Sequence, residues 1–153
     1  MNWNDFNDKT GLMRTVFFRG KDLSGTLQGA GGVGGLVAVS IGGQYYFPCY
    51  DNLGNVVAYV DENGSKVATY TYDVFGNTLS SSGSMRYAFP HRFSTKYCDE
   101  ATGLYYYGYR FYSPELGRWM NRDPIGESGG MNLYTMPVKP KRSRSTIFSR
   151  GTK

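Results

Sequence analysis

The chain has 153 residues, of which 40% are hydrophobic and only 19% charged, and this composition excludes both a membrane protein and a disordered chain driven by charge. The formal net charge of +5 suggests a polyanion partner until the charges are located. Residues 139–153 hold six of the 17 basic residues and no acid, which leaves 11 basic against 12 acidic residues, a net of −1, in residues 1–138. The positive excess therefore lies entirely in the C-terminal tail.

The N-terminal residues 1–14 are expected to form a lead-in and not a secretory signal. Acidic residues stand where a basic region should be, and no apolar stretch follows them. The most apolar stretch, residues 33–41, is interrupted by Gly34 and Gly35 and falls far short of the roughly 20 residues that a membrane helix needs. We therefore expect no signal peptide and no membrane span.

Residues 29–34 match the G-x-G-x-x-G pattern of dinucleotide sites. That interpretation requires a helix to open directly after the glycines. Residues 35–43 are instead β-branched and bracketed by glycine, which is typical of a strand. We expect a glycine-rich crossing where two backbones approach closely, and no cofactor site.

The clearest pattern lies between residues 44 and 82. Tyr-Asp-Asn-Leu-Gly-Asn at residues 50–55 recurs as Tyr-Asp-Val-Phe-Gly-Asn at residues 72–77, and a half-similar unit occupies residues 60–64. In each unit the aspartate accepts backbone N–H bonds and the glycine supplies a positive φ, so a tight turn is predicted between two short strands. The predicted fold is all-β, with almost no helix. Because such arrays need about three repeats for stability, the chain looks cut from something longer.

A second block, residues 86–134, is rich in aromatic residues. We predict that residues 105–112 form one central strand covered on both faces. Its tyrosines could stack sugars or bases, but Arg110 is the only basic residue among them, which favours packing over a ligand surface. His91, the only histidine, lacks a recognisable nucleophile motif and is expected to have a satisfied structural role.

Few residues suggest chemistry. Cys49 and Cys98 have no second thiol or histidine at ligand spacing, so no metal is expected, and two buried or partly buried free thiols are favoured over a disulfide. Asp123 begins an Asp-Pro-Ile-Gly turn, and a catalytic aspartate would need a second carboxylate nearby in space. Glu127 is adjacent in sequence, without a role that the sequence reveals.

Taken together, these segments resemble the Rhs/YD-repeat family, and specifically its C-terminal RHS repeat-associated core. The resemblance covers about residues 15–134 and rests on a combination of segments: residues 22–36, the two Tyr-Asp-x-x-Gly-Asn repeats, and the runs 92–97, 102–112, 117–126 and 132–134.

The family implies a large bacterial polymorphic toxin. Its YD repeats spiral into a hollow β-shell, the core segment plugs one end, and a variable toxin is held inside and cut free by an aspartyl autoprotease in the core. The resemblance places Asp123 and the preceding Arg122 in that protease motif. The family's second carboxylate and second Asp-Pro-x-Gly-Leu are missing, because no Asp or Glu follows Glu127.

We therefore expect an all-β fragment of a β-shell or cocoon with a disordered basic tail at residues 135–153. The expected function is structural, without payload and without cofactor, and Asp123 and Arg122 would be an inactive remnant. The implied partners are, in full-length relatives, the enclosed toxin and the secretion machinery. Full-length relatives are exported or associated with the cell surface, whereas the localisation of this chain stays open, cytoplasmic retention included.

The sequence offers two alternatives to the shell function. One is a surface or extracellular carbohydrate-binding β-repeat module that uses the tyrosines as stacking faces. The other is nucleic-acid binding through residues 139–153, although short basic runs at a terminus more often form a solvated tail, so no specific nucleic acid is expected.

Overall fold

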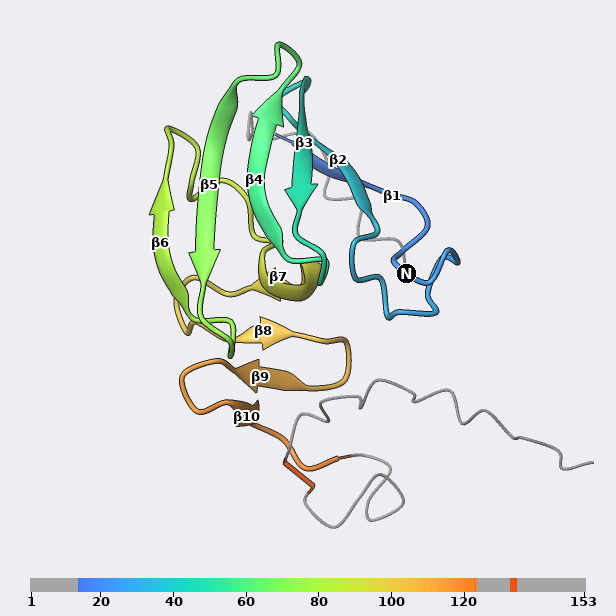
Figure 1. The fold of residues 1–153 in the computed structure, drawn as a ribbon, viewed down its shortest axis with the longest axis vertical. Helices are drawn as coiled ribbons and strands as arrows, with labels where there is room; N and C mark the ends of the chain where they lie inside the picture. The colour runs from blue at the N-terminus through green and yellow to red at the C-terminus, as the bar shows by residue number, and fades with distance from the viewer. Residues whose placement is uncertain (1–13, 124–132, 135–153) are drawn as a thin grey trace, which may run out of the picture.

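The computed structural model describes residues 14–123, 133 and 134 (Figure 1). These residues form ten β-strands and one short 3-10 turn, with no α-helix among them, so the all-β prediction is confirmed. Apart from Arg14, the predicted lead-in and the basic tail lie outside the described residues. The elements are β1 (Thr15–Arg19), β2 (Leu36–Ile41), β3 (Gln44–Tyr50), β4 (Val56–Asp61), β5 (Lys66–Tyr72), β6 (Thr78–Ser82), the turn η1 (Phe93–Thr95), β7 (Tyr97–Cys98), β8 (Tyr105–Tyr106), β9 (Phe111–Ser113) and β10 (Arg118–Trp119).

The strands form two antiparallel sheets. The first contains β1 to β6 in chain order, so every strand pairs with its neighbour in sequence. The second, in the order β10-β9-β8-β7, lies below the first sheet in Figure 1. All pairings join consecutive strands, and short turns set the register of the hairpins from β2 to β6, whereas β1 and β2 are joined by the longer loop of residues 20–35.

The YD turns have the geometry that the repeats predict. Asp51 Oδ1 accepts hydrogen bonds from the backbone N–H groups of Leu53 and Asn55, both at 2.9 Å, and the Asn55 side chain donates to Asp51 Oδ2 at 2.7 Å. The Asp73 carboxylate accepts the equivalent side-chain bond from Asn77 at 2.8 Å. The side-chain amide of Asn77 makes the largest contribution to lowering the pKa of Asp73. Backbone N–H groups of the turn lower this pKa further. Aspartate and asparagine thus close each turn as a pair.

The glycine-rich segment is the close crossing that the sequence predicts. It belongs to the loop between β1 and β2, and strand β2 follows it in place of a helix. Gly54, the glycine of the first YD turn, has φ of +79°, and a Cβ built there would lie 2.5 Å from the Val33 side chain and 3.3 Å from Gly34 N. Only a residue without a side chain fits both the turn and this crossing.

Asp22 organises the same loop. Its Oδ2 accepts hydrogen bonds from the backbone N–H groups of Ala30 at 2.8 Å and Gly32 at 3.0 Å, while Oδ1 accepts from the N–H and the hydroxyl of Ser24. The Ser24 hydroxyl first, and then these backbone donors, lower the pKa of Asp22 to about 2 against the opposing effect of burial.

The loop should therefore open in acid. Since the folded pKa of Asp22 is below its usual value of 3.8, its stabilising effect is complete above that value and is lost as the pH falls towards 2. We expect pepsin to cut at Leu23 and Leu27, both exposed, increasingly fast between about pH 4.5 and 2.5 when rates are normalised to an unstructured peptide. Asp22→Asn should be cut readily already at the upper end of this range. Equal normalised rates in the variant and the natural chain at every pH would show that the Asp22 carboxylate does not hold the loop closed.

The core of the first sheet is built from tyrosine rings whose hydroxyl groups bond to backbone carbonyls. Its fully buried members include Tyr59, Phe89, Val39 and Val56. Tyr59 stacks on Phe89 with ring centroids 3.9 Å apart, and its hydroxyl donates to the carbonyl of His91 at 2.8 Å. The same pattern recurs at three more tyrosines, Tyr50 to Leu36, Tyr70 to Arg86 and Tyr72 to Val56. The same tyrosines thus bury apolar rings in the core and provide their hydroxyl groups with hydrogen-bond acceptors.

The predicted central strand over residues 105–112 is wrong. These residues form a hairpin in which β8 pairs with β9, matching Tyr105 with Tyr112 and Tyr106 with Phe111. Gly108 has φ of +93° in the connection, and Tyr109 at its tip is 93% exposed. A glycine in the middle of the aromatic run allowed the reversal, and only one face of the hairpin is buried.

Candidate functional site

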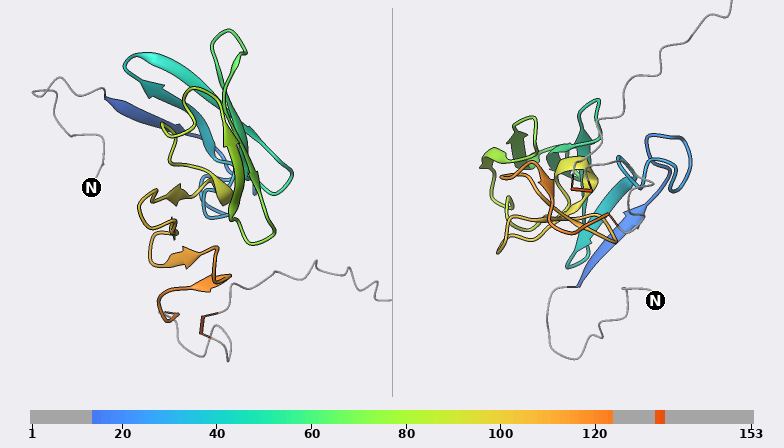
Figure 2. Two further views of the ribbon diagram at one scale, coloured as in Figure 1. Left: turned by 90° about the vertical axis from the view of Figure 1, so that its left-hand side faces the viewer. Right: turned by 90° about the horizontal axis from the view of Figure 1, so that it is seen from below.

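The segment that joins the two sheets, residues 86–98, is called the crossing segment here. It lies against one face of the six-stranded sheet in the turned views (Figure 2). Phe89 inserts into the core, and the backbone N–H of Val56 donates to the carbonyl of Arg92 at 3.1 Å. The crossing segment is thus held by hydrogen bonds from the backbone and the tyrosine hydroxyls of the first sheet.

The turn η1 ties three distant parts of the chain together. Thr95 Oγ1 donates to the carbonyl of Gly54 and accepts from the N–H of Gly34, each at 2.7 Å. The backbone N–H of Ser94 donates to Asn55 Oδ1 at 2.8 Å. Ser94 and Thr95 have φ of +51° and +55°, which is unusual for residues with a side chain and most of all for β-branched Thr95. The surrounding hydrogen bonds hold this strained conformation in place.

Arg92 anchors the crossing segment from inside. Its Nε donates to the carbonyl of Phe89 at 3.1 Å, and Nη2 donates to the carbonyl of Arg86 at 3.2 Å and forms an ion pair with Glu100. The guanidinium carbon lies 4.8 Å from the centre of the Tyr70 ring. A buried cation is tolerated here because carbonyls, a carboxylate and an aromatic face surround it.

His91 is buried and accepts a hydrogen bond at Nε2 from the guanidinium of Arg19 at 2.8 Å. Burial first, and then the charges of Arg19 and Lys96, lower its pKa to about 3, so the ring is neutral near pH 7. The structural role expected for His91 holds for Nε2, whereas Nδ1 has no hydrogen-bond partner among the described residues.

Asp123 lies at the end of the second sheet, in an ion pair with Arg110. Arg110 Nη1 is 2.9 Å from Asp123 Oδ2, and the guanidinium carbon lies 4.2 Å from the centre of the Trp119 ring. The backbone N–H of Asp123 donates to the carbonyl of Leu133 at 3.1 Å.

Sequence reasoning did not find Arg110 as the partner of Asp123. Arg122 was placed beside Asp123 by the family motif, but its side chain is exposed and no ion pair within the described residues joins the two. The role predicted for Arg122 stays a prediction. Glu127 and the rest of the turn lie outside the described residues. The one available signal for Arg110 was its position as the single basic residue in an aromatic run.

The described residues contain no group of three or more His, Cys, Asp and Glu side chains that could hold a metal ion. Cys98 is buried and Cys49 exposed, and both are free thiols, so the expectation of burial is wrong for Cys49, which lies on the exposed face of β3. In the part of the chain that the structure describes, no helix has the length and hydrophobicity to span a membrane.

The geometry does not favour the carbohydrate-binding alternative. In the second sheet Tyr105 and Tyr112 are buried, and their hydroxyls donate to the carbonyls of Gly76 and Phe75 in the second YD turn. Their rings and hydroxyls are thus used in joining the two sheets. The basic tail, on which the nucleic-acid alternative depends, lies outside the described residues.

Comparison with known proteins gives a consistent result. The family model of the Teneurin YD-shell matches residues 31–136. The toxin subunit YenC1 of Yersinia entomophaga is 42% identical over 91 residues, which are 57% of this chain and 9% of YenC1. The putative uncharacterized protein YibJ of Escherichia coli K12 is 37% identical over 90 residues, 59% of this chain and 39% of YibJ. The crystal structure of TcdB2-TccC3 superposes with a TM-score of 0.66 at 28% identity, covering 81% of this chain and 6% of that chain.

The chain thus spans well under half the length of these relatives. The matched family is a structural shell domain and not a catalytic family. The tyrosine-rich hairpins, the paired Asp and Asn of the YD turns and the match over residues 31–136 together confirm the predicted resemblance to the Rhs/YD-repeat family, and the chain belongs to the Teneurin YD-shell family.

Proposed function

We propose that this chain is a structural segment of an Rhs shell that encloses a toxin, and that the crossing segment and the second sheet close the wall at this point. The observation that carries the proposal is the way the two sheets are joined. Tyrosine hydroxyls of the second sheet bond to the second YD turn, and those of the first sheet bond to the crossing segment. These hydrogen bonds join the two sheets of the shell segment without a bound ligand.

The edges of the first sheet support the same function. Among the described strands, β1 and β6 each pair on one side only. Edge strands of this kind are completed by further strands of a longer sheet or by association. In the proposed shell, neighbouring YD repeats supply those strands, and the enclosed toxin segment is the partner of the finished wall.

A chimera tests this function directly. In TccC3, the segment equivalent to residues 31–136 is replaced by these residues, and the complex with TcdB2 is purified. We expect the chimera to co-elute with TcdB2 and to be digested by added protease no faster than the unmodified complex. The matched control carries Tyr59→Ala in the same insert. A chimera that is digested as fast as this control would contradict the shell function.

We propose further that Asp123 and Arg122 are a remnant of the family's autoprotease site, without activity in this chain. An aspartyl protease uses two carboxylates that share a proton. The ion pair that the structure describes for Asp123 is with the guanidinium of Arg110. This described pair places a cation beside Asp123, where an active dyad would need a second carboxylate.

The purified chain is expected not to cleave itself. After incubation for several days between pH 4 and 8, intact-mass spectrometry should give one species of about 17.1 kDa. Asp123→Asn, which removes the carboxylate and keeps the shape, should behave identically. A cleavage product that appears with the natural sequence and is missing with Asp123→Asn would show that the site is active.

A further inference from the structure

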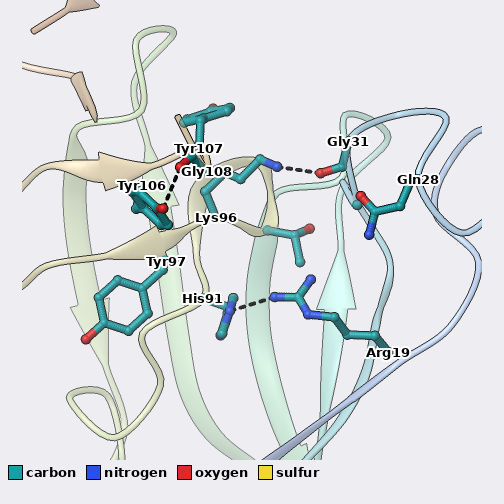
Figure 3. A pocket seen from close by; sticks show the side chains of 11 residues that line it. Arg19, Gln28, Gly31, His91, Lys96, Tyr97, Tyr106, Tyr107 and Gly108 are labelled. Atoms are coloured by element: carbon teal, nitrogen blue, oxygen red, sulfur yellow. Dashed lines mark hydrogen bonds between the residues drawn. The ribbon is translucent and has the colours of Figure 1, made fainter. Parts of the chain in front are cut away.

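A cavity of about 320 Å³ lies between the loop that follows β1 and the strands of the second sheet (Figure 3). In the figure, Arg19, Gln28 and Gly31 approach it from one side, and Tyr97 and Tyr106 from the other, with His91 and Lys96 between them. The Arg110–Asp123 pair is not among its lining residues. The shell function proposed above leaves this cavity without a role.

The cavity has two cations and no acid among its lining residues. Burial first, and then the charge of Arg19, lower the pKa of Lys96, so the two cations are close enough to repel one another. The negative charge of Asp22 acts in the opposite direction and raises the pKa of Lys96. Asp22 is not among the residues that line the cavity, and both of its oxygens accept hydrogen bonds from its own loop.

His91 lines the cavity and positions Arg19 there. An arginine can only donate, so the bond from Arg19 to Nε2 requires that nitrogen to be unprotonated, and the proton of the neutral ring must be on Nδ1. That Nδ1–H is buried and has no partner among the described residues. Because Nδ1 is shielded from solvent, His91 contributes to the cavity by holding Arg19 through Nε2.

Both cations are held in position before any ligand arrives. Arg19 is fixed by His91. Lys96 donates from Nζ to the carbonyl of Gly31 and lies 4.9 Å from the centre of the Tyr107 ring. A guanidinium presents two parallel N–H groups that match the oxygens of a carboxylate or phosphate. Pre-positioned donors reduce the entropy that binding would otherwise cost.

We propose that this cavity is a binding site for an oxyanion, a carboxylate or phosphate group held by Arg19 and Lys96. The volume is near the lower limit of about 300 Å³ for ligand pockets, which suits one such group with a short attached chain. The ligand supplies the negative charge that the lining residues lack. Two sources have this chemistry: a free or attached phosphate, and an acidic side chain of a polypeptide.

Equilibrium dialysis of the full chain tests the site, because it measures binding whether or not the protein associates. The probes are radiolabelled inorganic phosphate and radiolabelled N-acetylglutamate amide, each at pH 7 with chloride keeping the ionic strength constant. We expect saturable binding of one probe molecule per chain. Lys96→Gln should weaken it at least about tenfold, because the variant removes the charge and with it a charge-assisted hydrogen bond. Lys66→Gln, at an exposed lysine on β5, is the matched control and should bind as the natural chain does.

The outcomes separate the two sources. Binding of phosphate alone supports a phosphate ligand, binding of N-acetylglutamate amide alone supports an acidic side chain, and binding of both supports a general oxyanion site. Hydrogen exchange with the bound probe should be slowed in peptides that cover residues 28–34 and 91–97. If neither probe binds above the chloride background, or if Lys96→Gln and the natural chain bind equally, the proposal is wrong. Should Lys96→Gln lose its β-sheet circular dichroism, Arg19→Gln, at an exposed side chain, gives the same test.

Discussion

Replacing Tyr59 by alanine is expected to lower the free energy of unfolding by about 3–5 kcal/mol, the range for removing a buried aromatic side chain. Tyr59 is fully buried, stacks on Phe89 and donates its hydroxyl to the carbonyl of His91. The change removes the ring from the core and the hydrogen bond that holds the crossing segment. Urea unfolding followed by tryptophan fluorescence measures the effect.

Two further variants divide this effect between the ring and the hydroxyl. Tyr59→Phe keeps the ring and loses only the hydrogen bond, so we expect a cost of about 1–2 kcal/mol. Tyr109→Ala, at a side chain that is 93% exposed, should change the stability by no more than about 0.5 kcal/mol. A loss below about 1 kcal/mol in Tyr59→Ala would mean that this tyrosine is not part of the essential core.

The second large effect is expected at Arg92. Arg92→Ala should cost about 3 kcal/mol, because it leaves the buried carbonyls of Phe89 and Arg86 without their donor and removes the cation from the Tyr70 ring. Glu100→Gln should cost less than about 1 kcal/mol, since the Glu100 side chain is 49% exposed and water replaces it as a partner.

This asymmetry distinguishes two accounts of Arg92. If the ion pair were the main contribution, both variants would cost the same, and that result in urea unfolding would contradict the role assigned to the carbonyls. Arg92→Lys is a useful intermediate, because the three N–H groups of a lysine share one nitrogen and lack the fixed, spread geometry with which a guanidinium reaches both carbonyls. We expect its stability to lie between those of Arg92→Ala and the natural chain.

Local features of the fold were predictable from the sequence for a physical reason. The YD turns depend on groups no more than four residues apart, such as Asp51 with Asn55, so their geometry is encoded within a few residues. Hairpins then pair consecutive strands, and the register follows from the turn. The error over residues 105–112 arose where one glycine reversed a run whose side chains are typical of a strand.

The candidate sites depend instead on distant contacts. Arg110 is 13 residues from Asp123, and Arg19 is 72 residues from His91. Neither pair has a periodic pattern, since each results from where two sheets and a crossing segment come to lie. The left-handed Ser94 and Thr95 have no local signal either, because polar groups of two distant loops impose their conformation.

The sequence by itself therefore determined the all-β class, the YD turns, the family and the location of the excess positive charge in residues 139–153. Only the tertiary structure decided how tyrosine hydroxyls join the two sheets, which arginine pairs with Asp123, and where Arg19 and Lys96 meet around a cavity. The physical reason is the range of the interactions. Turn chemistry acts over a few bonds, whereas a cavity and its charge arise only when segments that are remote in the chain pack together.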